Sequence, residues 1–450
     1  MRRQLKFGIG ACFLGVVCLM ALRGSADTRL AAKPSKAKGG VTFSKGVASL
    51  IYDKCSVCHH EGEVAPFSLT NYKEIKKHGQ QIALITQKGI MPPWRAEHGF
   101  GEFLGERVLS DEQKQMLQDW VKAGMPEGNP NEAPKSPVFT KGWQNGNPDL
   151  VVESSQGFDV GASGDDVFQC FVIPTNYTED RYISGVEVKP GNRSVVHHVL
   201  AFLDTSGQAR KLDAADPSQG YSSYGGVGFL PSGVIAGWAP GNEPTKLPEG
   251  IGILLPKGAD VVLQVHYHKS GKAEEDQTRV GLTFHSKPVD KRVRTAMVIN
   301  PFFYIPAGAK AHEVRASTPL PGDVTLISVT PHMHLLGREM TVVAETPEGK
   351  VVPLVRVSNW NFNWQMTYGF KNPISVPKST QLKLVAKYDN SVENPLNPRN
   401  PPKGASWGEQ TTDEMCIAFV SYLVDSEHLT KGVEAPGFPD FGGAGRRRKK

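Results

Sequence analysis

The sequence predicts a multidomain protein, with a small all-α domain followed by two all-β antiparallel, jelly-roll-like sandwich domains. A chain of 450 residues is long enough for two or three ordinary domains. Its 47 glycines and 33 prolines favour short elements separated by many turns. Helical patterns end before residue 130, and β-rich runs bounded by turn residues follow them.

The first 26 residues have the pattern of an export signal. Arg2 and Arg3 give a basic start, residues 7–22 form an uncharged apolar run, and Ala26 is a small residue suited to cleavage. An uncleaved membrane anchor is the alternative, although the run is short for a membrane span. We therefore expect a secreted or periplasmic bacterial protein.

The charge of the chain gives no reason to expect a nucleic-acid partner. There are 51 basic and 45 acidic residues, and four of the basic ones lie in the signal. Five more are the last five residues, so the remaining chain has a small net negative charge. Residues 431–450 are expected to be a basic disordered tail. Membrane contact is expected only through this tail or an uncleaved signal.

Residues 41–125 are predicted to form the helical domain. The clearest helix within it covers 110–124, with Ser110 as N-cap and Gly124 at its end. Its apolar residues fall on one face. Residues 126–147, rich in Pro, Asn and Gly, are predicted to be a linker.

The two sandwiches are predicted at residues 148–287 and 288–430. Strand-like runs rich in β-branched residues recur there, for example at 167–173, 261–267 and 324–330. Cys170 and Cys416 lie in this region. An oxidising compartment would allow a disulfide between them, and their pairing stays open.

The segment Cys55-Ser-Val-Cys58-His59 is a C-x-x-C-H motif. In haem attachment the two thiols form thioethers with the haem, and the histidine ligates the iron. A thiol redox pair or a zinc pair is the alternative. Met91, held between Ile90 and two prolines, is the preferred second iron ligand because a thioether raises the haem potential. The rival ligands are Met116, Met125, His78 and His98. Residues 41–125 thus resemble the class I cytochrome c family, which implies one covalently bound haem c.

Histidines gather at three places in the β-rich part. They are His197 with His198, His266 with His268, and His332 with His334. On a strand, positions two apart point to the same face, so His332 and His334 can reach one metal. Adjacent histidines need a local twist or a bulge to do the same. Imidazole ligands suit Zn, Cu, Fe or Ni, and isolated structural histidines are the alternative.

Four motifs in a fixed order resemble the copper type II, ascorbate-dependent monooxygenases, the family of peptidylglycine α-hydroxylating monooxygenase and dopamine β-monooxygenase. They are Val195-Val-His-His-Val199, Leu263-Gln-Val-His-Tyr267, His332-Met-His-Leu-Leu-Gly-Arg338 and Thr412-Asp-Glu-Met-Cys416. The resemblance covers about residues 148–425 and implies two copper ions. An electron-transfer copper would be held by His197, His198 and His266, and an oxygen-activating copper by His332, His334 and Met415. The thioether of Met415 favours Cu(I) over zinc.

The sequence departs from this family at several places. Animal members carry several disulfides, whereas only Cys170 and Cys416 are available here. Thr330 stands where peptide-amidating relatives have the arginine that binds the substrate carboxylate, and Phe419 replaces an expected tyrosine. Peptide amidation is therefore disfavoured. His268 lies beyond the matched motif and is expected to be a supporting or surface group.

The resemblance implies an enzyme that inserts one oxygen atom of O2 into a C–H bond of a small organic substrate or a peptide. The fused haem motif suggests that an external donor supplies electrons through haem, in place of ascorbate. Gln264 is expected to orient substrate or water between the coppers. Trp360, Trp364 and Tyr368 are expected either to line a pocket or to pack in the core.

Two other functions remain open at this stage. The chain would be a periplasmic haem and copper electron-transfer or copper-binding protein without oxygenase activity if no oxygen site forms. It would be a carbohydrate- or protein-binding scaffold if the histidines are structural.

Overall fold

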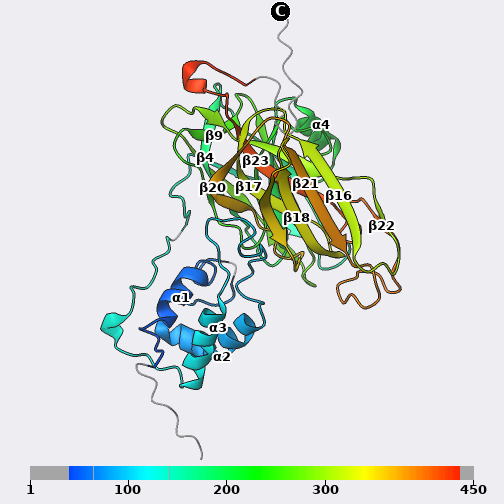
Figure 1. Cartoon of the computed structure of the whole chain (residues 1–450). Coiled ribbons are helices and arrows are strands. Elements are labelled where there is room, and N and C mark those ends of the chain that lie inside the picture. The colour runs from blue at the N-terminus through cyan, green and yellow to red at the C-terminus, as the bar shows by residue number, and fades with distance from the viewer. Residues whose placement is uncertain (1–39, 64, 141, 225, 436–450) are drawn as a thin grey trace, which may run out of the picture. The chain divides into compact units, whose positions relative to one another are not determined.

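The computed structural model describes residues 40–435, except 64, 141 and 225 (Figure 1). The expected export signal, with Cys12 and Cys18, and the last basic residues lie outside the described residues. The described residues from Val41 onward form one compact unit. Within the described ranges, no helix is both long enough and apolar enough to cross a bilayer.

Three helices precede the β-rich part. They are α1 (Val47–Lys54), α2 (Tyr72–Gln87) and α3 (Asp111–Lys122). Ser110 caps α3, because its Oγ accepts from the Gln113 amide at 3.2 Å while the Gln113 side chain accepts from the Ser110 amide at 2.9 Å. The helices share a small core that includes Ile51, Ile75 and Trp120. The short helix η1 (Pro130–Glu132) follows.

The next part of the chain forms two sheets around one core. One sheet has the strand order β1 (Leu150–Glu153), β12 (Arg279–Phe284), β4 (Arg181–Lys189), β9 (Ile251–Leu255) and β13 (Lys291–Arg292), with β8 (Thr245–Lys246) beside β4. The other has the order β6 (Tyr221–Ser222), β3 (Val167–Pro174), β10 (Asp260–Tyr267), β5 (Val196–Asp204) and β7 (Gly233–Trp238). Side chains from both sheets, such as Ile183 and Val261, meet in the core between them. The pair β2 (Phe158–Val160) with β11 (Glu274–Asp276) and helix α4 (Gln208–Ala215) complete this part.

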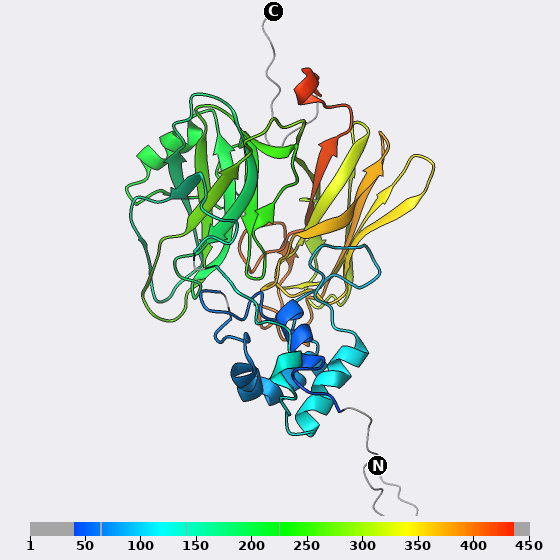
Figure 2. The same cartoon turned by 90° about the vertical axis from the view of Figure 1, so that its left-hand side faces the viewer.

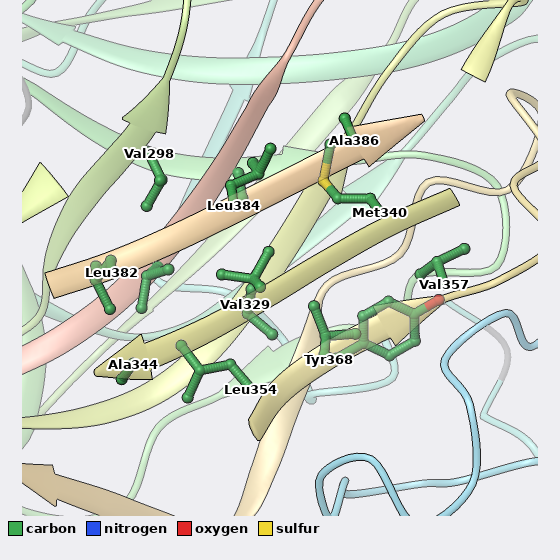
Figure 3. Close-up of a cluster of buried hydrophobic side chains, with 14 of the residues drawn as sticks. Val298, Val329, Met340, Ala344, Leu354, Val357, Tyr368, Leu382, Leu384 and Ala386 are labelled. Carbon is green, nitrogen blue, oxygen red and sulfur yellow. The ribbon is translucent and has the colours of Figure 1, made fainter. Parts of the chain in front are cut away.

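The last part of the chain forms a second pair of sheets. One has the order β14 (Arg294–Ile299), β23 (Ile417–Val424), β17 (Val324–His332) and β20 (Tyr368–Val376). The other has the order β16 (His312–Pro319), β21 (Gln381–Tyr388), β18 (Gly337–Glu345) and β19 (Val351–Val357). The small pair β15 (Tyr304–Ile305) with β22 (Ala405–Ser406) and the short helix η2 (Leu429–Lys431) lie outside these sheets. Val329, Leu384 and Tyr368 lie in the core between the two sheets (Figure 3). Figure 2 shows the two groups of strands, green for the earlier part and yellow to red for the later one.

The predicted fold class is wrong. In the described ranges the chain has 23 strands and only four α-helices, and no separate all-α domain precedes the strands. After α2 the chain leaves the helices, and Ala96 forms a β-bridge with Val357 while Phe103 forms one with Phe370. Both side chains are buried in the core of the last sheets. Because these apolar residues complete a β core, the helices belong to the same compact unit as the strands.

The two β-rich parts are also joined more closely than independent domains would be. Strand β13 lies within the residues expected for the second sandwich, yet it pairs in parallel with β9 of the earlier sheet. Arg292 of β13 in turn binds Glu427, with its Nη2 2.5 Å from Oε1. The predicted domain boundaries stay predictions.

Candidate metal centres

His197, His198 and His266 form a first imidazole cluster on the neighbouring strands β5 and β10. Their candidate ligand atoms all lie within 4.8 Å of one another. Nδ1 of His198 is 3.2 Å from Nδ1 of His197 and 3.3 Å from Nδ1 of His266. His266 pairs with His198 and Tyr267 pairs with Val196, so the register shifts at His197. This bulge lets two adjacent histidines contribute to one cluster.

Asp166 orients the first cluster from outside. Its Oδ2 accepts from Nε2 of His266 at 2.9 Å, and its Oδ1 lies 2.9 Å from Nδ1 of the exposed His268. Burial opposes ionisation of Asp166, but hydrogen bonds from His266 and His268 outweigh it and lower the pKa of the carboxyl group. Since Nε2 of His266 carries the donated hydrogen, its Nδ1 presents a lone pair to the other two imidazoles.

The first cluster suits a metal ion because its imidazoles are neutral and their lone pairs converge. Burial, and then the neighbouring His266, lower the pKa of His197 to about 3. Burial also lowers the pKa of His198 well below its usual range. In the described chain, the buried Nε2 of His197 has no hydrogen-bond partner. Three neutral imidazoles with ligand atoms within 4.8 Å of one another can hold one metal ion, and imidazole ligands suit copper as well as zinc, iron and nickel.

His332 and His334 form a second imidazole cluster at the end of β17. Their rings lie 5.2 Å apart and at 90°. Nδ1 of His332 contacts Oε1 of Gln365, and Nδ1 of His334 lies 3.3 Å from the carbonyl oxygen of Asp413. These acceptors favour hydrogens on both Nδ1 atoms, which leaves the Nε2 lone pairs for a ligand. Burial lowers the pKa of His332 to about 4, so its imidazole is neutral at neutral pH.

Glu414 joins the second cluster to Met415. Its Oε2 accepts from the backbone N–H of His334 at 2.9 Å and from that of Met415 at 3.2 Å. Its Oε1 accepts from the backbone N–H of Leu336 at 2.6 Å. Burial raises the pKa of this carboxyl group to about 8. One buried carboxyl group therefore links the backbone of His334 to that of Met415, whose thioether is the soft donor that the family resemblance implies for copper.

The other expected site residues have structural partners. Nε2 of Gln264 donates to the carbonyl oxygens of Ser223 at 3.0 Å and Gly226 at 2.6 Å, so this amide nitrogen braces a loop. Trp360 and Tyr368 are buried in the core between the two sheets of the last part of the chain, so they pack in the core, which was one of their two expected roles. Nε1 of Trp360 nevertheless donates to the carbonyl oxygen of His334 at 3.0 Å, next to the second cluster.

The C-x-x-C-H motif follows α1, with Cys55 at its C-cap and the thiols of Cys55 and Cys58 unpaired. Nδ1 of His59 lies 3.1 Å from the carbonyl oxygen of Phe67, which leaves Nε2 available to ligate iron. A cavity of about 700 Å³ lies beside Val57, the middle of the motif, but its walls are mostly charged side chains, and Cys55, Cys58, His59 and Met91 do not line it. The free thiols and the free ring nitrogen fit a haem.

Met91 lies on the loop after α2, where its backbone N–H is 3.5 Å from the carbonyl oxygen of Ile85. No hydrogen bond or ring contact joins it to His59 in the part of the chain that the structure describes. Among its rivals, Met116 and Met125 pack against the helical core. His78 stacks on Phe67 at 3.8 Å, and His98 binds Glu106 at 2.7 Å.

Cys170 and Cys416 are unpaired and buried in different hydrophobic clusters. Burial raises the pKa of each thiol to about 12. The disulfide that the sequence left open is therefore absent between these two described residues.

Sequence reasoning missed Asp166, Gln365 and Glu414. Glu414 stands inside the motif at 412–416, so its place beside the expected ligand Met415 was a usable signal. Asp166 and Gln365 have no such signal, because each meets its histidine only through tertiary packing.

Loss of the Asp166 carboxylate should weaken metal binding at the first cluster. We expect Asp166→Asn to lower Cu(II) affinity about 10- to 100-fold, the usual effect of removing the partner of a ligand histidine. Titration of the metal-free protein with Cu(II) measures this. His268→Ala is the matched control, because it removes the other partner of the same carboxylate. If Asp166→Asn bound Cu(II) as tightly as the unsubstituted protein, Asp166 would not support metal binding by His266.

The metal-free protein should lose stability as the pH falls below about 6.5. An unfolded histidine has a pKa near 6.5, whereas the folded pKa is about 3 for His197 and about 4 for His332. The unfolded chain therefore binds protons first, and the free energy of unfolding decreases between about pH 6.5 and these lower values. Each histidine contributes at most about 1.4 kcal/mol per pH unit.

Urea unfolding at a series of pH values measures this slope. We expect His332→Gln to have a shallower slope than the unsubstituted chain. An identical slope would show that His332 does not take up a proton on unfolding.

His332 and His334 lie within a stretch of the chain that is similar to a known protein domain. Residues 293–432 match the family model described as "Copper type II ascorbate-dependent monooxygenase, C-terminal domain". The mouse (Mus musculus) protein "DBH-like monooxygenase protein 2" is 24% identical over 252 residues. That alignment covers 51% of this chain and 38% of the mouse protein, so the chain spans well under two thirds of its relative's length.

Similarities to solved structures are weak. The VP2 subviral particle of infectious bursal disease virus covers 64% of this chain and 74% of its own, with a TM-score of 0.18 and 8% identity. The PBSX exported protein XepA covers 58% and 91%, with a TM-score of 0.15 and 10% identity. These overlaps carry no argument about fold or function. The family match and the mouse relative, by contrast, show a similarity to copper type II monooxygenases, and the family match is limited to residues 293–432.

Proposed function

We propose that this chain is a copper-dependent monooxygenase that hydroxylates a C–H bond of a small organic substrate with O2. In this proposal the first imidazole cluster holds an electron-transfer copper. His332, His334 and Met415 hold the copper at which oxygen reacts. The observation that carries the proposal is the second cluster, where Glu414 accepts from the backbone N–H groups of both His334 and Met415 and so links the end of β17 to the methionine segment. A soft thioether donor favours Cu(I), the form that reacts with oxygen, over zinc.

The balanced reaction converts a C–H bond, O2, two electrons and two protons into a C–OH group and water. Bound copper would supply the one-electron steps and the reaction with O2. The protein's own groups set the geometry: Asp166 fixes the ring of His266, and Gln365 fixes that of His332. Burial keeps the imidazoles neutral, so their lone pairs stay available at neutral pH.

Metal analysis combined with oxygen uptake tests this proposal. Two coppers per chain, and product formed in proportion to the O2 consumed by the reduced protein, are expected. A protein that binds copper but forms no product under reduction would instead be an electron-transfer or copper-binding protein. Absence of copper after reconstitution would overturn both functions.

We further propose that electrons reach the first cluster from an external donor through a haem attached at Cys55 and Cys58, with His59 and Met91 as iron ligands. Support comes from the unpaired thiols and from one contact across the molecule. Glu63, four residues after His59, binds Nη1 of Arg193 at 3.1 Å. Arg193 lies just before β5, the strand that carries His197. We also propose, from the export-signal pattern, that the protein acts outside the cytoplasm.

Replacement of both motif cysteines tests the haem. We expect Cys55→Ala with Cys58→Ala to abolish the covalently bound haem absorbance, because no thioether can form. Copper content should not change, since the imidazole clusters are untouched. The unsubstituted protein should carry covalent haem when it is expressed together with haem-attachment machinery. If it carries none, the proposed attachment at Cys55 and Cys58 is refuted. If haem is present but its rapid reduction leaves the Cu(II) EPR signal unchanged, the electron route is wrong.

A further inference from the structure

The ring of Phe362 lies between the two imidazole clusters. It stacks on His197 with ring centroids 4.5 Å apart and planes at 18°. Its centroid is also 5.7 Å from that of His334, with the planes at 84°. Both distances are those of direct aromatic contact. One side chain therefore touches a histidine of each cluster, and it is only 8% exposed.

The segment that carries Phe362 is anchored to the second cluster. Nε1 of Trp360 donates to the carbonyl oxygen of His334 at 3.0 Å, and the Gln365 side chain contacts His332. Nε2 of Gln365 also donates to the carbonyl oxygen of Phe362 at 2.8 Å. Residues 360–365, which we call the bridging segment, thus contact the second cluster through Trp360 and Gln365, and the bond from Gln365 to Phe362 lies within the segment.

The bridging segment also binds the earlier β-rich part of the chain. Nδ2 of Asn242 donates to the carbonyl oxygen of Gln365 at 3.3 Å, and its Oδ1 accepts from the Thr367 amide at 3.1 Å. Asn242 follows β7, the strand that pairs with β5 beside the first cluster. These hydrogen bonds fix the segment on both sides, so the Phe362 ring is held in place between the clusters.

We propose that Phe362 is a positioning residue that fixes the His197 ring and excludes water from the space between the two metal sites. This inference rests on the proposed function, because it assigns a role to the ring only if both clusters hold metal. A filled space between the sites would limit the escape of reduced oxygen species before the substrate reacts, since closed sites suppress such side reactions. It also requires the substrate to approach the second cluster from a side that the ring does not cover.

Four variants of the full-length, copper-loaded protein test the proposal. Phe362→Ala removes the ring, Phe362→Leu keeps an apolar side chain without a ring, and Phe362→Tyr keeps the ring. Phe302→Ala is the control, because Phe302 is 89% exposed. The readouts are Cu(II) affinity, the relaxation rate of water protons in the Cu(II)-loaded protein, and peroxide released per O2 consumed.

We expect Phe362→Ala to lower Cu(II) affinity at the first cluster about 10-fold and to raise both water-proton relaxation and peroxide release. Phe362→Tyr should restore the values of the unsubstituted protein, Phe362→Leu should restore them only in part, and Phe302→Ala should change none. A purely structural role for Phe362 predicts lower thermal stability with unchanged water-proton relaxation. That result, or equal relaxation in all variants, would overturn the proposal.

A metal-free measurement separates this inference from the proposed function. Histidine-labelled protein without metal should show an altered His197 ring signal in Phe362→Ala and an unaltered one in Phe302→Ala, because the stacked ring shifts it. If the unsubstituted protein binds no copper, the monooxygenase proposal fails, while this signal still decides whether the ring fixes His197. If copper binds and the signal does not change, the inference alone fails.

Discussion

Replacement of His334 by alanine should abolish product formation and remove one of the two bound coppers. The residue is 4% exposed, and it belongs to the cluster that we assign to oxygen chemistry. Loss of a direct ligand should cost more than the roughly 100-fold loss caused by changing a ligand's partner. Product assays and metal analysis on the same sample measure both effects.

The matched control for this variant is His312→Ala. His312 begins β16 and lies in neither imidazole cluster. It should keep two coppers and full activity. If His334→Ala retained two coppers and normal product formation, the second cluster would not be the oxygen site.

Replacement of Glu414 by alanine should strongly destabilise the protein and separate Met415 from the second cluster. The carboxyl group is fully buried and accepts backbone N–H groups of His334, Leu336 and Met415. Each buried N–H left without an acceptor costs about 1–3 kcal/mol. A loss of several kcal/mol is large against the roughly 5–15 kcal/mol that stabilises a typical domain.

Glu414→Gln distinguishes the packing of this side chain from its hydrogen bonds. Glutamine has nearly the same shape, but only one of its two terminal atoms accepts a hydrogen bond. We expect a smaller loss of stability than for Glu414→Ala, with weakened copper binding at the second cluster. Thermal unfolding and copper titration measure these effects, and Glu348→Ala in the exposed turn after β18 is the control. Equal stability of Glu414→Ala and the control would refute the bracing role.

Several local features could be read from the sequence. Ser110 and Gln113 occupy the two positions of a capping box, and they begin α3 as that local pattern requires. Adjacent histidines at 197 and 198 required a bulge, and the register of β5 against β10 shifts there. These features depend on residues close together in the chain, so the local pattern is sufficient to predict them.

The prediction of a separate all-α domain was wrong because it depended on patterns among neighbouring residues. The contacts that join this region to the sheets are made by residues far apart in the chain. Helical periodicity over 110–124 says nothing about residues 94–104, which pair with β19 and β20 more than 250 residues later. Trp94 packs against Tyr368 with ring centroids 5.1 Å apart. No period or spacing in the sequence encodes such a contact.

By itself, the sequence determined which side chains are available for metal chemistry: the paired histidines, the late methionine and the C-x-x-C-H motif. Their spacing and donor types are local properties, so they could be read without coordinates. Only the tertiary structure decided that the helices share one unit with the sheets and that Cys170 and Cys416 stay apart. It also decided that Asp166, Glu414 and Phe362 surround the imidazoles. These contacts join strands and loops far apart in the chain, and packing of the two β cores brings them together.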